Sequence, residues 1–86
     1  MATIQEVITA ARRIDRESDG LRVRLLAAEG QMRSSVGRLA PTVKGSRSGE
    51  AAVREVQDAQ AQVKAAVNEL QALHRSIDDF VRDLEK

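Results

Sequence analysis

Apolar and small residues recur at alternating steps of three and four along two long segments of the chain, residues 3–39 and 52–84. A repeat of this kind, averaging 3.5 residues, is typical of α-helices that pack side by side as coiled coils. The stretch between the segments contains Pro41 and Gly45, which interrupt helices. The pattern therefore predicts an all-α fold, a long antiparallel helical hairpin with a helix at 3–39, a connector at 40–48 and a helix at 49–85.

The first expected helix begins with a capping box, in which the Thr3 side chain accepts a hydrogen bond from the backbone N–H of Glu6. Gly20 follows a serine and an aspartate, so it is also a turn signal, and it leaves open three helices at 3–19, 21–38 and 49–85. The phase of the apolar pattern does not shift at Gly20, which favours one continuous helix. The expected seam of this helix is Ile4, Val7, Ala11, Ile14, Ser18, Leu21, Leu25, Ala28, Met32, Ser35 and Leu39.

The connector is expected to begin near Ala40, because Pro41 disfavours helical geometry in the residue before it. Ser48 is the expected N-cap of the second helix, since a serine hydroxyl accepts one of the unpaired N–H groups there. Glu50 then lies close to the positive end of the helix dipole.

The apolar face of the second helix is wider than one antiparallel neighbour can cover. We therefore expect two hairpins to dock as a four-helix bundle. In the first helix, a line of small residues is either a groove for another backbone or a solvent-facing surface. The residues expected at the partner interface are Val53, Val56, Val63, Val67, Leu70, Leu73, Ile77, Phe80, Val81 and Leu84, together with Gly20, Val23, Ala27 and Gly30.

Composition supports this picture of a single helical-hairpin domain, residues 1–86. A chain this short buries little of its surface by itself, which favours oligomerisation. The net charge of +1 gives no reason to expect nucleic acid or a membrane surface as partner. No apolar run approaches the roughly 18 residues that a membrane span needs, and charges within residues 1–20 are unlike a signal peptide. We expect no nucleic-acid partner and no membrane insertion.

The sequence contains no recognisable constellation for catalysis, so we expect a protein that is not an enzyme and that uses no cofactor or metal. There is no cysteine, and His74 is the single histidine. No serine is expected near that histidine along the hairpin. His74 falls on the expected seam, where it either packs half-exposed or destabilises an apolar interface when protonated.

The turn motif Val43, Lys44 and Gly45 lies at the midpoint of the chain and is followed by small residues and a second long helix. This arrangement resembles the WXG-type (early-secreted-antigen-like) helical-hairpin proteins of type VII secretion, which place Trp-x-Gly at that turn. Gly45 matches the glycine of the family, whereas Val43 replaces its tryptophan.

The same family carries an export signal near the end of its second helix, an aromatic residue followed after three spacers by an acidic residue. Here Phe80 is followed by Asp83 one position early and by Glu85 one position late. His74 and Asp78 have the correct spacing but a different aromatic residue.

The resemblance implies a non-enzymatic protein that acts through helix-bundle pairing and is secreted without a cleaved signal peptide. Its partner would be a second copy, a similar helical hairpin or a larger secreted substrate, and one partner can carry the export signal for both. The alternative that the residues leave open is a cytoplasmic coiled-coil adaptor or structural protein with no export role.

Overall fold

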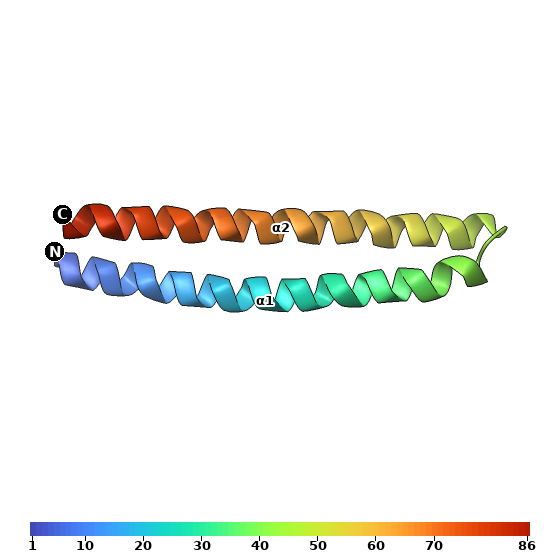
Figure 1. Cartoon of the computed structure of the whole chain (residues 1–86), viewed down its shortest axis with the longest axis horizontal. Helices are drawn as coiled ribbons and strands as arrows, with labels where there is room; N and C mark the ends of the chain where they lie inside the picture. The colour runs from blue at the N-terminus through green and yellow to red at the C-terminus, as the bar shows by residue number, and fades with distance from the viewer.

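A computed structural model describes all 86 residues as two long helices joined by a short connector. Helix α1 spans Ile4–Thr42 and helix α2 spans Arg47–Glu85. The helices run antiparallel and side by side, so that both termini lie at one end of the molecule and the connector at the other (Figure 1). The expected all-α helical hairpin is therefore confirmed.

Helix α1 is continuous through Gly20, which excludes the three-helix alternative. Its N-cap is Thr3, whose hydroxyl accepts a hydrogen bond from the Glu6 backbone N–H at 3.1 Å, as the capping box predicted. Satisfying this N–H matters because the first four N–H groups of any helix lack a partner within the helix.

The break between the helices is shorter than residues 40–48. Helix α1 continues past Pro41 to Thr42, so only one residue of the helix follows the proline, and the Val43 N–H still bonds the Leu39 carbonyl at 3.1 Å. Helix α2 begins at Arg47, two residues earlier than expected. Its N-cap is Ser46, so the prediction of Ser48 was wrong. The connector consists of residues 43–46.

The largest cluster of buried apolar residues lies towards the end of the hairpin that holds the termini. Ala11, Ile77 and Val81 form this core cluster, with Ile8 packed against it, and Val81 is fully buried. Only 6 of the 86 residues are buried. The hairpin therefore has a narrow line of contact between its helices and no enclosed interior.

The molecule is a rod, with extents of 62 × 19 × 15 Å and a radius of gyration of 19.2 Å. A compact domain of this length would have a radius of gyration of about 12 Å. In such a rod each helix covers the other along one side only, so the remaining sides are open to solvent or to a partner.

Candidate functional site

The side of α1 that faces α2 carries charged residues among the apolar ones. Helix α2 presents the valine- and leucine-rich line that the sequence predicted. The α1 residues that are buried or half-buried along the seam include Ile8, Ala11, Arg12, Asp15, Ser18, Arg22, Leu25, Glu29, Met32 and Val36. Five of the eleven expected α1 seam residues are exposed, namely Ile4, Ile14, Leu21, Ser35 and Leu39, so the prediction was wrong for these. Asp15, Arg22 and Val36 take the places of Ile14, Leu21 and Ser35 beside α2.

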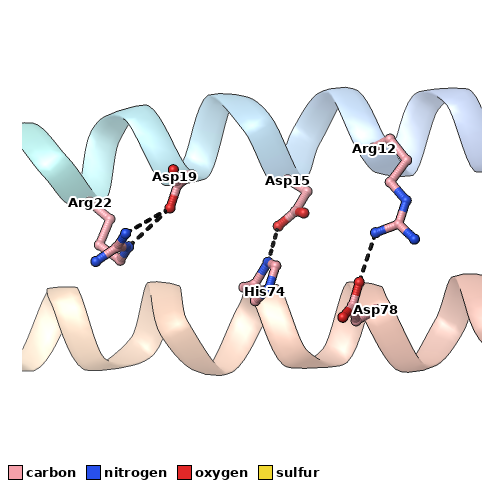
Figure 2. A network of polar contacts seen from close by, with 6 residues as sticks. All are labelled: Arg12, Asp15, Asp19, Arg22, His74 and Asp78. Carbon is pink, nitrogen blue, oxygen red and sulfur yellow. Dashed lines mark hydrogen bonds and ion pairs between the residues drawn. The ribbon is translucent and has the colours of Figure 1, made fainter.

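Two cross-helix contacts bring charged groups together near the termini (Figure 2). The Arg12 guanidinium donates to the Asp78 carboxylate at 2.7 Å, and this hydrogen bond lowers the pKa of Asp78. Nδ1 of His74 lies 2.7 Å from Oδ1 of Asp15. The hydrogen bond with Asp15 and the charge of that carboxylate raise the pKa of His74 above 6.5.

A third polar contact lies near the middle of the hairpin, where the Glu29 side chain is only 5% exposed. Glu29 accepts hydrogen bonds from Arg33 and from Nε2 of Gln60, the latter at 2.9 Å, and Lys64 lies 3.8 Å away. The hydrogen bonds from Arg33 and then Gln60 lower the pKa of Glu29, so the buried carboxylate stays ionised. Glu29 was not among the predicted residues, although its position between Leu25 and Met32 follows the repeat.

His74 and Asp15 line an open depression of about 630 Å³ that also includes Ser18, which corrects the expectation that no serine lies near His74. No hydrogen bond joins Ser18 to the imidazole, and activating a serine nucleophile requires one. The chemistry that the contacts themselves provide is the sharing of a proton between His74 and Asp15. No group of three or more His, Asp or Glu side chains is arranged to hold a metal ion.

The opposite face of the hairpin is apolar. A shallow groove of about 620 Å³ there is lined by Ala28, Gln31, Met32 and Ser35 of α1 and by Ala52, Glu55, Val56 and Ala59 of α2. Residues seven apart lie on one side of a helix in such a pair, so the same face continues along both helices. We call this surface the apolar face: Val7, Ile14, Leu21, Ala28 and Ser35 of α1, and Ala52, Ala59, Ala66, Leu73 and Phe80 of α2.

The structure divides the expected partner interface into three groups. Val53, Val56, Val63, Val67, Leu70, Ile77, Val81 and Leu84 are buried or half-buried and pack in the seam between α1 and α2, although Val56 also lines the groove. Leu73 and Phe80 are 37% and 47% exposed and belong to the apolar face. Gly20, Val23, Ala27 and Gly30 lie outside the seam, and no atom of α2 comes within 4 Å of where a side chain on Gly20 or Gly30 would begin.

The turn motif is packed on itself. A β-carbon at Gly49 would lie 2.5 Å from the Val43 β-carbon, so Val43 covers the start of α2. Gly45 has φ +89°, a conformation that favours glycine. Its N–H donates to the Glu50 carboxylate at 3.2 Å. Lys44 is exposed at the tip of the hairpin.

The residues of the candidate export-signal region fall into two groups, one in contact with α1 and one exposed. His74 and Asp78 are both held in contacts with α1, as described above. Phe80, Asp83 and Glu85 are exposed near the end of α2, and Asp83 lies 3.6 Å from the Lys86 ammonium.

No protein-family model, no curated protein and no solved structure matches this chain. Neither helix is long and apolar enough to cross a membrane.

Proposed function

We propose that this chain is a non-enzymatic helical-hairpin protein that acts by pairing its apolar face with another helical hairpin. The proposal rests on one observation: the packing of α1 against α2 leaves the apolar face exposed. It includes Ile14, Leu21, Leu73 and Phe80, which are 51%, 43%, 37% and 47% exposed. Large apolar side chains in one continuous strip mark a surface for protein contact.

The pairing role is of the kind found in type VII secretion substrates and their small partner or adaptor proteins. Support comes from the hairpin shape, the Gly45 turn and the exposed Phe80, Asp83 and Glu85 near the end of α2. The partner is a second copy, a similar hairpin or a larger secreted substrate. Secretion would occur without a cleaved signal peptide.

A coiled-coil adaptor with no export role is the second candidate, and the connector favours it. Val43 replaces the expected tryptophan and is packed against Gly49, so the turn displays no aromatic side chain. His74 and Asp78 are likewise engaged within the hairpin.

Export can be tested by mass spectrometry of culture supernatants from cells with an intact and with a disrupted type VII apparatus. We expect the chain, with its N-terminus intact, only in the supernatant of the former. The variant D83A/E85A should lower its amount at least tenfold, whereas D58A, an exposed acid in the middle of α2, should not. A chain retained in the cells in every case would support the adaptor role instead.

A further inference from the structure

The apolar face is uneven along its length. Towards the termini it carries large side chains, Val7 and Ile14 on α1 and Leu73 and Phe80 on α2. Towards the connector the equivalent positions are small, and there the groove of about 620 Å³ is found. The half of the apolar face near the termini therefore carries projecting side chains, and the half near the connector is hollowed.

We propose that the partner on this face is a second copy of the chain, related by a two-fold axis perpendicular to the rod at the level of Leu21 and Ala66. This inference rests on the proposed pairing function and names its partner. The two residues lie at nearly the same height, as the Glu29–Gln60 and Asp15–His74 contacts on either side of them show. A two-fold axis makes each copy present the same surface to the other.

The size of each side chain supports this axis. Positions equally far from Ala66 become neighbours across it, so Phe80 lies over Ala52 of the second copy and Leu73 over Ala59. On α1, positions equally far from Leu21 do the same. Ile14 then lies over Ala28, and Val7 over Ser35. At the axis Leu21 meets Leu21 and Ala66 meets Ala66, and away from the axis each large residue meets a small one, which favours close packing without voids.

A two-fold axis along the rod gives the opposite result. It would place α1 over α2 of the second copy, with Phe80 over Val7 and Leu73 over Ile14. The terminal half would then be overpacked, while Ala59 over Ala28 would leave the groove empty. Both errors destabilise a packed interface.

The charges at the rim of the apolar face agree with the perpendicular axis. Glu17 and Arg24 follow Ile14 and Leu21 of the apolar face by three residues, so they lie at its outer edge on α1. Both are exposed, and neither forms an ion pair within the hairpin. The axis brings Glu17 of each copy beside Arg24 of the other. On α2 the rim acids Glu55, Glu69 and Asp83 lie opposite Ser76, Gln62 and Ser48, so no like charges meet.

The available area is sufficient. The face runs from Val7 to Ser35, about 42 Å at 1.5 Å per residue, and the hairpin is 19 Å wide. The product, about 800 Å² per copy, equals the area that a stable protein interface usually buries on each partner.

Cysteine crosslinking of the full chain, which contains no natural cysteine, tests the arrangement. In A66C the new thiols meet at the axis, so mild oxidation should yield a covalent dimer. The matched control A52C makes the same substitution on the same face, but its two thiols would lie on opposite sides of the axis, about 42 Å apart along the rod. It should crosslink at least tenfold more slowly. Equal rates, or no crosslink by A66C in a sample whose mass is that of a dimer, would overturn the axis.

Sedimentation measurements of the dimer mass, on the wild type and on variants that exchange a large and a small side chain, complete the test. F80A should raise the dimer dissociation constant at least tenfold, because a buried aromatic anchor is lost from each half. Adding A52F should restore dimerisation, since the large and small residues exchange places. Circular dichroism checks that each variant keeps its helices. A wild-type monomer at micromolar concentration overturns the inference. Such a monomer, if still secreted, leaves the proposed export role standing, whereas a dimer that is never secreted removes that role alone.

Discussion

At the residue scale, polar contacts determine which side of α1 faces α2. Arg12, Asp15 and Glu29 each find a partner on α2, and these contacts recur along the seam. Turning α1 to bury Ile14 and Leu21 instead would separate these groups from their partners. A buried carboxylate such as Glu29 is stable only while its hydrogen bonds are kept.

The His74–Asp15 contact predicts a pH effect opposite in sign to the destabilising switch considered from the sequence. Because the pKa of His74 is raised in the folded hairpin, the protonated form stabilises the fold. This contribution is complete below a pH of about 6.5 and is lost as the pH rises through the folded pKa. We expect the melting temperature to fall between about pH 6 and pH 8.

The variant D15N provides the control, because it removes the carboxylate while keeping the shape of the side chain. NMR titration should show a His74 pKa above 6.5 in the wild type and a lower one in D15N. The melting temperature of D15N should be nearly constant across the same pH range. A wild-type His74 pKa below 6.5 would contradict the prediction.

Burial of single side chains makes a second prediction at this scale. Val81 is fully buried against Ala11 and Ile77, so V81A should lower the free energy of unfolding by about 2 kcal/mol. V23A makes the same change where the side chain is 53% exposed, and it should alter stability by less than about 0.5 kcal/mol. Urea unfolding of both variants measures the difference, and equal losses would show that Val81 is not in the core.

At the scale of the element, each helix depends on its ends and on a phase that is kept over its full length. Thr3 and Ser46 cap the two helices with their hydroxyl groups. Pro41 is tolerated because only Thr42 follows it in α1, so a bend at the proline displaces almost none of the helix. Gly20 does not break α1, since the residues on either side of it hold one continuous seam against α2.

Substituting glycines should separate their roles. No side chain and no part of α2 lies within 4 Å of a β-carbon at Gly20, and its conformation is helical, so G20A should stabilise the hairpin by about 1 kcal/mol. Gly45 has φ +89°, so G45A should destabilise it by about 1 kcal/mol. Thermal unfolding followed by circular dichroism measures both. A destabilising G20A would mean that another backbone approaches α1 at that position.

At the scale of the whole molecule, two helices of 39 residues form a rod with too little interior to bury their apolar residues. Contact along one side leaves the apolar face open, while the opposite face carries the polar contacts of Figure 2. A partner on the apolar face would supply the missing layer of a helical bundle. Stability would then depend on protein concentration, because binding favours the folded state.

The sequence by itself determined the two helices, their antiparallel connection and the apolar line of α2. These features follow from local signals, namely the repeat of apolar residues, the capping residues and the glycine at the turn. The expected connector was too long for two reasons. Pro41 does not end α1, which continues to Thr42, and of the two nearby serines that could cap α2 the structure uses Ser46 instead of Ser48.

Only the tertiary structure decided which side of α1 faces α2, and hence which residues remain for a partner. Two lines of α1 share Ala11, Ser18, Leu25 and Met32, and hydrophobicity favours the line through Ile14 and Leu21. The structure uses the neighbouring line, because Asp15 and Glu29 have partners on α2 that are distant in the sequence. Such pairings depend on the register between two helices, which no property of one helix specifies.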